Sequence, residues 1–465
     1  MYICAVDIGT TAIKTIIVDE QGNKCASSSA SYPLYTGSGG VVEQDALKWK
    51  ELTFQTVREC TAAIASDEVG CICISAQGGS LVPVNENGEP LAYAAIWMDK
   101  RGEGFLPEIK RGRDHTWFYS RIGRGVSPTS CLGRFMAFKE YNPAYYLTTL
   151  EYINMALTGS PITDPTSAAM TSMMDIRTCR WQEEIMELCG VEEHTLPSIM
   201  PTGAVIGNIT REAADAMGLT ANTVVVNGGH DQYCAAAGAN VLEPGDVLLS
   251  TGTAWVVFGA TNVLNHDSRL AAGPHVCPGV YGIFSSVPSG GAALDWVRRK
   301  LSWTSELSFE KLDYEVMKRF GRNEKLFLRP LFSNGKASIE GLDLHTDVYD
   351  IALAAMEGVV FEVRRIMERF ISEGHAVNSV KLLGGASRAL PWQKLITSVI
   401  GEVDLFHETN IACMGAAALG GVAIGVWSDL KAASKLLCSS EVLPADNVFS
   451  EFYEKKYTAY LNSSV

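Results

Sequence analysis

Short apolar runs alternate with amphipathic stretches along the whole chain. The β-like runs occupy residues 2–6, 12–18, 70–75, 223–226, 246–250, 255–259 and 380–383. Apolar positions recur with helical spacing over residues 46–64, 145–157, 210–217, 347–372 and 391–400, each flanked by Gly, Pro or Asn. This alternation of strands and helices predicts an α/β architecture in which helices cover sheets.

A domain boundary is expected near the middle of the chain. The Pro-Gly pair at 244–245 ends one periodic segment, and a new β-like run follows directly. A weak internal repeat agrees with this boundary, because a strand, a Gly-Thr turn and a second strand occur around 9–10 and again around 252–253. We therefore predict two domains of similar plan, residues 1–241 and 242–465, facing each other across a cleft that holds the ligand.

Composition and charge restrict the class of partner. The chain has 465 residues, of which 47% are hydrophobic and 19% are charged, as in ordinary globular proteins. The 52 acidic residues exceed the 38 basic ones, and the net charge of −14 argues against nucleic acids and anionic membranes as partners. The uncharged run 409–428 is long enough for a membrane span, but its many Gly and Ala residues predict a buried small-residue helix instead.

The start of the chain and its cysteines bear on the compartment. The first residues lack a basic segment and reach a carboxylate at Asp7, so no secretory signal is expected. The 12 cysteines include no C-x-x-C pair. A cytoplasmic protein with reduced thiols is therefore predicted.

The two Gly-Thr turns are candidate phosphate sites. Glycine permits the positive φ that directs successive backbone N–H groups toward one point, and threonine hydroxyls add further donors. Asp7, just before the first turn, is a candidate partner for Mg²⁺ through water, unless it only caps its own turn. Lys14 is either a phosphate contact or a solvated lysine.

Asp231 is the candidate for acid–base chemistry. It follows a β-like run and a Gly-Gly-His segment, at the predicted start of a small-residue helix. The helix N-terminus is expected to keep the carboxylate ionised, and such a group can take a proton from a hydroxyl that attacks phosphorus. The alternative is a simple helix cap. His230, for which the sequence supplies no partner, is interpreted as structural.

A third strand-to-helix turn contains Gly384 and Gly385, where a backbone without side chains allows a flat ring to lie against it. Other enzyme signatures are missing from the sequence. It contains no G-x-x-x-x-G-K-[ST], no H-E-x-x-H and no G-x-S-x-G, and the glycines at 37–40 lack the dinucleotide spacing. These absences tell against a Walker-type NTPase, a zinc protease, a serine hydrolase and a Rossmann dehydrogenase.

In this order, the motifs resemble those of the FGGY family of carbohydrate kinases, which have the actin-like ATPase fold. Residues 7–11 look like the family's first phosphate hairpin, 250–253 like its second, and 384–387 like its adenosine-contacting turn; residues 337–342 and 350–357 are similar to its C-terminal signature. Residues 42–49 and 242–245 are most similar to xylulokinase-like members. The resemblance covers nearly the whole chain and implies two actin-like, ribonuclease H-like α/β domains.

The resemblance also implies roles for individual residues. Asp231 matches the catalytic base, and with Asp7 it is expected beside the metal. The residues expected to contact ATP and its phosphates are Gly9, Thr10, Thr11, Lys14, Gly252, Thr253, Gly291, Gly384, Gly385, Ala386 and Ser387. Those expected to contact the acceptor are Gln77, Gly78, Trp97, Asp99, Asp231 and Gln232.

Two segments depart from the xylulokinase pattern. Residues 75–80 read Ser-Ala-Gln-Gly-Gly-Ser where xylulokinases usually show Gln-Met-His-Gly, so the usual sugar-contacting histidine is absent. Residues 133–136 read Gly-Arg-Phe-Met where many members have a lysine and a tryptophan nearby. These segments bear on the choice of sugar.

The resemblance implies a kinase that uses ATP and Mg²⁺ to phosphorylate a hydroxyl of a small sugar, with a ketopentose such as xylulose expected. One alternative is glycerol or another polyol as acceptor. An alternative of another class is a non-catalytic, actin-like regulator that binds ATP or sugar and would not need Asp231. Closure about a hinge at 240–245 would exclude water, and scattering profiles with and without ligands test it. The oligomeric state stays open, with a homodimer as one candidate.

Overall fold

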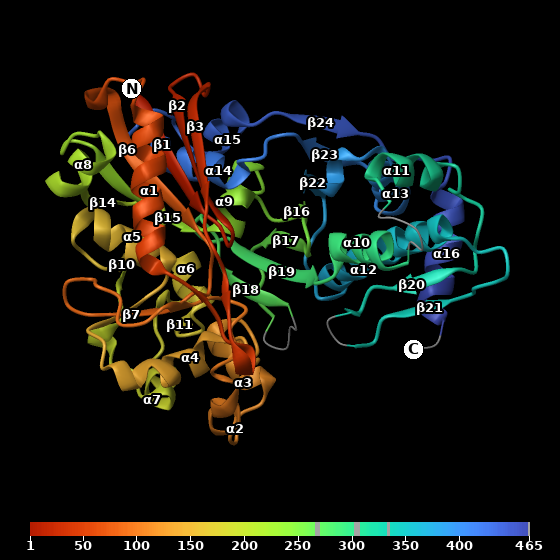
Figure 1. Cartoon of the computed structure of the whole chain (residues 1–465), viewed down its shortest axis with the longest axis horizontal. Coiled ribbons are helices and arrows are strands. Elements are labelled where there is room, and N and C mark those ends of the chain that lie inside the picture. The colour runs from red at the N-terminus through yellow and green to blue at the C-terminus, as the bar shows by residue number, and fades with distance from the viewer. Residues whose placement is uncertain (266–269, 302–306, 333–334, 464–465) are drawn as a thin grey trace. The chain divides into compact units, whose positions relative to one another are not determined.

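The computed structural model describes residues 1–265, 270–301, 307–332 and 335–463, and its internal contacts divide the chain into two compact units (Figure 1). Unit 1 consists of Met1–Leu242, Leu264–Ile283 and Asn410–Cys438. Unit 2 consists of Glu243–Val263, Phe284–Thr409 and Ser439–Val465. Both units combine helices and sheets, as the alternating pattern predicts.

A mixed sheet forms the centre of unit 1, with the strand order β14-β15-β6-β1-β2-β3. Its strands are β1 (Tyr2–Ile8), β2 (Ala12–Asp19), β3 (Lys24–Ser31), β6 (Val69–Ala76), β14 (Val205–Asn208) and β15 (Val224–His230). Strands β1, β6 and β15 run parallel, whereas β2, β3 and β14 are antiparallel to their neighbours. The carboxyl ends of β1, β6 and β15 therefore meet at one edge of the sheet, which is where parallel sheets place ligands.

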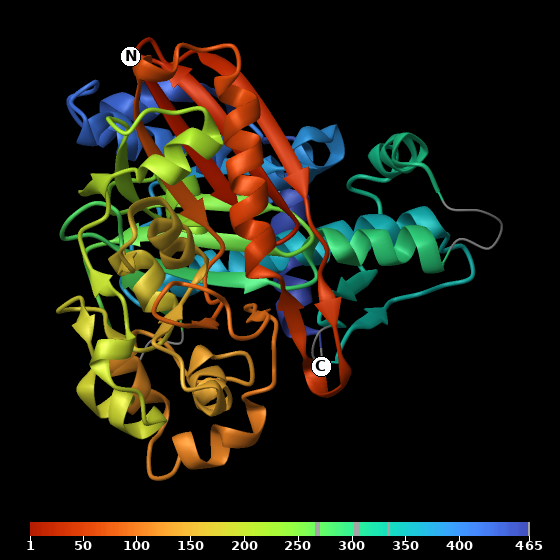
Figure 2. The ribbon, with the colours of Figure 1, turned by 60° about the vertical axis from the view of Figure 1, so that its left-hand side comes forward.

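Helices cover both faces of this sheet, and Figure 2 shows α1 lying along one of them. The helices α1 (Ala46–Thr61), α5 (Thr149–Thr158) and α8 (Arg211–Met217) contribute side chains to one core, into which Cys4, Val6 and Ile8 of β1 point. The other face packs against α9 (Asp231–Gly238) and α14 (Ile411–Ala423). Because side chains alternate along a strand, Asp7 lies on the α9 and α14 side.

Close backbone contact explains why α9 and α14 are rich in small residues. An added Cβ at Gly415 of α14 would lie 1.8 Å from the Cys234 carbonyl oxygen, and one at Gly238 of α9 would lie 2.2 Å from the Ile411 carbonyl oxygen. The expectation of a buried small-residue helix is confirmed, although α14 is shorter than the run 409–428. None of the helices in the described ranges is long and apolar enough to span a membrane.

The segment between β6 and β14 builds a second core in unit 1. It includes β7 (Val82–Val84), β8 (Ala94–Ala95), α2 (Leu106–Ile109), α3 (His115–Ile122), α4 (Cys131–Phe138), β9 (Tyr145–Leu147), β10 (Ile162–Thr163), α6 (Pro165–Met170), β11 (Met174–Asp175), β12 (Arg180–Trp181), α7 (Glu183–Cys189) and β13 (Ser198–Ile199). Phe118, Phe135 and Phe138 are at most 2% exposed in this core.

The remaining elements of unit 1 are short. Strands β4 (Tyr35–Thr36) and β5 (Val42–Gln44) pair with each other, and β5 also pairs with β8. Helix α15 (Leu430–Leu437) follows α14, and β18 (Ala271–Pro274) packs beside α6.

Unit 2 has its own mixed sheet, in which the strands follow the order β19-β17-β16-β22-β23-β24. Their bounds are β16 (Asp246–Thr251), β17 (Trp255–Thr261), β19 (Tyr281–Val287), β22 (Ser379–Gly384), β23 (Val403–Phe406) and β24 (Ser440–Leu443). As in unit 1, an antiparallel hairpin (β16 and β17) lies beside a parallel neighbour (β22). The sequence repeat thus corresponds to a repeated supersecondary structure.

The helices of unit 2 are α10 (Gly290–Lys300), α11 (Phe309–Met317), α12 (Val348–Ser372), α13 (Leu390–Val399) and α16 (Ser450–Asn462), and β20 (Phe327–Arg329) pairs with β21 (Ser338–Glu340). A buried ion pair joins α12 to α16, with Lys456 Nζ 2.5 Å from Glu357 Oε2 and both side chains at most 3% exposed. Burial raises the pKa of Glu357.

The predicted elements correspond closely to those observed, with one change of type. Residues 145–157 were expected to form one helix, but Tyr145–Leu147 are strand β9, paired with β7, and the helix starts after Thr148. Thr148 and Glu151 form a capping box there, which ends the extended segment and begins α5.

Candidate active site

The first Gly-Thr turn joins β1 to β2 and is held by the side chains of Gln44, Trp97 and Tyr32, the last of which donates its hydroxyl to the Gly9 carbonyl oxygen. Its backbone closes through a hydrogen bond from Gly9 N–H to the Ala12 carbonyl oxygen, at 3.0 Å. Thr10 is bound twice: Gln44 Nε2 donates to its carbonyl oxygen at 2.5 Å, and Trp97 Nε1 donates to its Oγ1 at 3.1 Å. The turn, which also contains the exposed Thr11, is therefore rigidly oriented.

Asp7 lies at the end of β1, opposite Lys14 of β2 and level with Ser75 of β6. Ser75 Oγ donates to Asp7 Oδ1 at 2.8 Å. Burial, and next the negative charge of Asp231, raise the pKa of Asp7 to about 6, although Ser75 and Lys14 oppose this rise. The two predicted carboxylates are thus close enough for their charges to interact.

Asp231 is the first residue of α9, directly after β15. Its side chain is 26% exposed. Burial raises the pKa of Asp231 to about 7, and the hydrogen bond from the Gln232 N–H opposes the rise only partly. The helix N-terminus is expected to keep this group ionised, and burial opposes that effect, so Asp231 holds its proton more tightly than an exposed aspartate does.

His230 is the residue that precedes the helix, and it contacts this carboxylate. Its ring nitrogen Nε2 lies 3.3 Å from Asp231 Oδ1, and the backbone N–H of His230 donates to Thr166 Oγ1 at 2.9 Å. Burial, together with the positive charge of Arg124, lowers the pKa of His230 to about 3. The imidazole is therefore neutral at physiological pH.

Two predicted acceptor residues carry buried oxygens that have no partner within the described structure. Gln77 donates its Nε2 to Gln44 Oε1 at 2.7 Å, but its own Oε1 has no hydrogen-bond partner there, and the same holds for Oε1 of Gln232. A buried, unsatisfied acceptor is costly unless a ligand supplies the donor. Both oxygens suit the hydroxyl donors of a polyhydroxy compound.

Asp99 occupies a different environment from the one implied by an acceptor role. It is 0% exposed, and both carboxylate oxygens bind Arg101, at 2.9 Å each, while Oδ2 also accepts from the Val42 N–H at 2.7 Å. These bonds tie the segment after Trp97 to β5. A contact between Asp99 and the acceptor stays a prediction.

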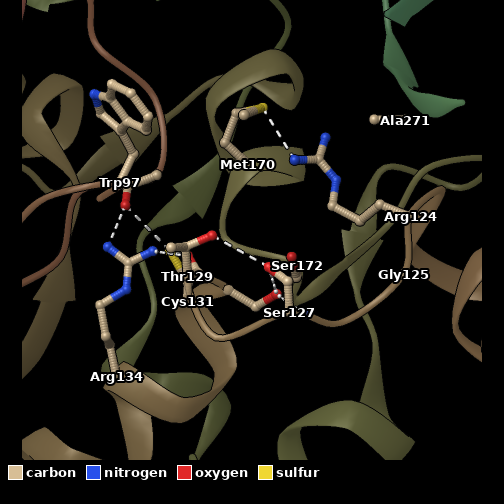
Figure 3. A pocket seen from close by; sticks show the side chains of 12 residues that line it. Trp97, Arg124, Gly125, Ser127, Thr129, Cys131, Arg134, Met170, Ser172 and Ala271 are labelled. Atoms are coloured by element: carbon tan, nitrogen blue, oxygen red, sulfur yellow. Dashed lines mark hydrogen bonds between the residues drawn. The ribbon is translucent and has the colours of Figure 1, made fainter. Parts of the chain in front are cut away.

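A cavity of about 330 Å³ lies in unit 1 near the Gln77–Gly79 loop (Figure 3). Its lining is Gly79, Trp97, Arg124, Gly125, Ser127, Thr129, Ser130, Cys131, Arg134, Met170, Ser172 and Ala271. Of the predicted acceptor residues, only Trp97 is among these described lining residues. Figure 3 shows Arg124 and Arg134 on opposite sides of the cavity.

The two arginines differ in what holds them. Arg134 is 1% exposed and donates to the carbonyl oxygens of Gly79, Ile96 and Thr129, at 2.5–2.8 Å. Arg124 donates Nη1 to Met170 Sδ at 3.3 Å, a weak acceptor for a cation. Arg124 carries no sequence signal of a ligand contact, because it stands in an irregular Gly-Arg-Gly segment with no motif around it.

Those of the predicted nucleotide residues that belong to unit 2 lie close to one another. Gly291, near the start of α10, donates its N–H to the Gly252 carbonyl oxygen at 3.1 Å, and Ala292 donates to that of Thr253 at 3.2 Å. An added Cβ at Gly291 would lie 2.6 Å from the same Gly252 oxygen. The helix and the second Gly-Thr turn can therefore touch only because residue 291 is glycine.

The turn after β22 joins the same group of residues. Ser387 N–H donates to Thr251 Oγ1 at 3.2 Å, and Thr251 Oγ1 donates to the Leu383 carbonyl oxygen at 2.8 Å. Gly384 has φ +109°, and a Cβ there would lie 2.6–2.8 Å from Thr251 atoms. Gly385 is exposed and has no heavy atom within 4 Å of its ideal Cβ, so its open backbone can accommodate a flat ring.

Comparison with known families assigns these motifs. The family model described as FGGY family of carbohydrate kinases, N-terminal domain, matches residues 2–238, and the corresponding C-terminal domain model matches residues 247–424. The chain belongs to the FGGY family of carbohydrate kinases. It is thus a phosphotransferase that acts on an alcohol group, and FGGY kinases use ATP as phosphate donor.

Relatives of this FGGY kinase are similar over nearly their whole length. A xylulose kinase from Staphylococcus epidermidis is 26% identical, with 98% of this chain and 95% of the relative covered. A gluconokinase from Bacillus subtilis is 24% identical, with 94% and 91% covered. The crystal structure of xylulose kinase from Rhodospirillum rubrum superimposes with a TM-score of 0.93, at 23% identity and with 99% and 98% covered. The two-domain FGGY kinase fold, which is actin-like, is thereby shown.

Proposed function

We propose that this FGGY kinase transfers the γ-phosphate of ATP to a hydroxyl of a small sugar, with Asp231 as the base. The observation that carries the proposal is the state of Asp231: a carboxylate directly after strand β15, still a quarter exposed, whose pKa burial raises to about 7. Such a group is substantially ionised at neutral pH and also basic enough to accept a hydroxyl proton as transfer proceeds.

In the proposed step, the acceptor oxygen forms a bond to the γ-phosphorus while the bond from that phosphorus to the β,γ-bridging oxygen breaks. The bridging oxygen keeps the electron pair and leaves with ADP, and Asp231 takes the hydroxyl proton. The Gly-Thr turns of residues 9–11 and 252–253 are proposed to donate N–H and hydroxyl groups to the phosphates. Gly291 and residues 384–387 are proposed to contact the nucleotide, and Lys14 the phosphates.

The residues present also suit Mg²⁺. Asp7 and Asp231 are interacting carboxylates on one side of the unit 1 sheet, and a divalent cation would relieve their mutual repulsion. Within the described residues, no three His, Cys, Asp or Glu side chains form a metal cluster, so water and phosphate oxygens would complete the coordination. When bound, Mg²⁺ would neutralise phosphate charge; we propose Asp7 as the residue that orients it through water.

For the acceptor, we propose a ketopentose such as xylulose first, with glycerol or another polyol as the alternative. The unsatisfied Oε1 atoms of Gln77 and Gln232 support an acceptor rich in hydroxyl donors. Relatives named xylulose kinase support the ketopentose. Trp97 lines the cavity and also donates its Nε1–H to Thr10 Oγ1 of the phosphate turn. We therefore propose that Trp97 holds the acceptor beside the phosphate.

A sugar acid is a second candidate, favoured by the cavity. Its described lining includes two arginines and no carboxylate, and Arg124 acts electrostatically on His230 beside the proposed base. Guanidinium groups are preferred partners for carboxylates. Relatives named gluconokinase agree with this candidate.

The test is ADP release with Mg·ATP across D-xylulose, other ketopentoses, aldoses, glycerol, other polyols and D-gluconate, run beside Asp231→Asn. We expect acceptor-dependent turnover that falls by about 10²–10⁴-fold in the variant, the contribution typical of a general base. Comparing turnover with D-xylulose and with D-gluconate separates the two candidates. Undiminished turnover in Asp231→Asn would contradict the role of Asp231.

A further inference from the structure

His230 occupies a space that exists only because residue 78 is glycine. An ideal Cβ at Gly78 would lie 2.0 Å from His230 Cδ2, 2.4 Å from His230 Nε2 and 2.8 Å from Met170 Cγ. Atoms that are not bonded to each other do not come this close, so any other residue at position 78 would displace the imidazole. Gly78 is not among the glycines with positive φ, so the backbone conformation does not itself require glycine. The glycine therefore serves to make room for the ring.

The imidazole is confined on its other sides. It is 5% exposed, and the Tyr233 ring packs against it edge-on, with centroids 5.7 Å apart. Within the described structure its Nδ1 has no hydrogen-bond partner. The polar contact that its side chain makes there is the one from Nε2 to Asp231 Oδ1, at 3.3 Å.

These contacts differ from those expected of a histidine that only fills a core. A buried polar nitrogen without a partner is unfavourable, and an apolar side chain of similar size would avoid that cost. The arrangement instead places one imidazole nitrogen, Nε2, next to the carboxylate that the proposed function requires. The interpretation of His230 as a purely structural residue rested on the lack of a partner, and the structure identifies Asp231 as that partner.

We propose that His230 is a positioning residue for Asp231, with its Nε2–H donating to Oδ1 so that Oδ2 stays directed to the acceptor hydroxyl, and that Gly78 is the specific residue that permits this contact. The inference rests on the proposed function of Asp231. It also gives a reason for glycine at 78, because the histidine at the β15–α9 junction occupies the space beside this loop.

The first test separates the donor from the volume of the ring. His230→Leu keeps an apolar side chain of similar size without a donor, whereas His230→Gln keeps an amide N–H donor. With D-xylulose, or D-gluconate if xylulose gives no turnover, we expect His230→Leu to lower kcat by about tenfold or more while the KM values for acceptor and ATP change less than twofold. His230→Gln should recover a substantial part of kcat. Equal kcat in both variants and the parent protein would overturn the proposal.

The second test uses the steric pairing of Gly78 with His230. Gly78→Ala in the parent should lower kcat about as much as His230→Leu, because the added methyl displaces the ring. In a His230→Ala background, the same change should lower kcat less than twofold, because the space is already vacated. Independent, multiplicative effects of the two substitutions would contradict the pairing. A crystal structure of Gly78→Ala provides a readout that needs no acceptor: the distance from Asp231 Oδ1 to His230 Nε2 should exceed 3.3 Å.

Asp231→Asn distinguishes the two levels of inference. If it turns over like the parent protein, the assignment of the base fails and this proposal fails with it. If Asp231→Asn loses turnover and His230→Leu does not, the function stands and only the positioning role is refuted. Circular dichroism and thermal unfolding of each variant identify losses caused by misfolding, and His230→Gln then serves as the decisive comparison.

Discussion

Replacing Asp231 with asparagine should stabilise the ligand-free protein, because the site disfavours the ionised carboxylate. In the unfolded chain an aspartate has a pKa near 3.9. In the folded protein burial raises the pKa of Asp231 to about 7. The folded state therefore holds this proton more tightly, and its stability falls as the pH rises from about 4 to 7. Asparagine has the same shape and no charge, so it avoids this loss.

The expected magnitude follows from the pKa difference. A difference of one in pKa corresponds to about 1.4 kcal/mol, so the ionised carboxylate destabilises the fold by at most about 4 kcal/mol above pH 7. Because a quarter of the side chain is exposed to screening water, about 2–4 kcal/mol is expected. Asp231→Asn also removes the negative charge that raises the pKa of Asp7. Asp7 then ionises at a lower cost in the folded protein, so this effect stabilises the variant further.

The assay is urea unfolding of the ligand-free protein at pH 4.5 and pH 8, followed by circular dichroism. Asp231→Asn should unfold at a higher urea concentration than the parent at pH 8, and the difference should shrink strongly at pH 4.5. Asp99→Asn is the matched control in the same unit: it weakens the bonds to Arg101 and should destabilise. An Asp231→Asn variant that is less stable than the parent at pH 8, or equally shifted at both pH values, would refute the reasoning.

Three further outcomes are expected. Lys456→Met leaves the Glu357 carboxylate buried without its cation and should lower the free energy of unfolding by about 3–5 kcal/mol. Adding Glu357→Leu to the same chain should restore most of this loss, and urea denaturation of the single and double variants measures the two changes. Gly384→Ala forces a methyl group within 2.8 Å of Thr251 at a positive φ and should weaken ATP binding at least tenfold by calorimetry, and unchanged affinity would contradict the nucleotide assignment of this turn. Trp97→Phe removes the N–H donor to Thr10 but keeps a ring, so kcat/KM for the acceptor should fall about threefold to tenfold in steady-state assays, and no change would show that the bond to Thr10 is dispensable.

Much of the architecture could be predicted from the sequence because local pattern determines it. Short apolar runs indicated the main strands, because these strands are buried on both faces of the sheets, and period-3.6 spacing of apolar residues indicated the main helices. Glycines at turns carried the phosphate and nucleotide motifs, because close backbone approach requires the absence of a side chain, as at Gly291 and Gly384. Where local signals compete, prediction was less accurate: residues 145–147 have helical spacing, but pairing with β7 makes them a strand.

The electrostatic state of the site was decided only by the tertiary structure. Adjacent residues in the sequence do not reveal how much water is excluded from Asp231, and this desolvation, rather than its place at a helix start, raises its pKa. Similarly, the contact between Gly78 and His230 joins residues far apart in the chain, and the charge of Arg124 acts on His230 through the fold. Sequence motifs indicated the family and the candidate carboxylate Asp231, whereas the packing of distant segments determined the surroundings of that carboxylate, because solvation and steric fit depend on three-dimensional neighbours.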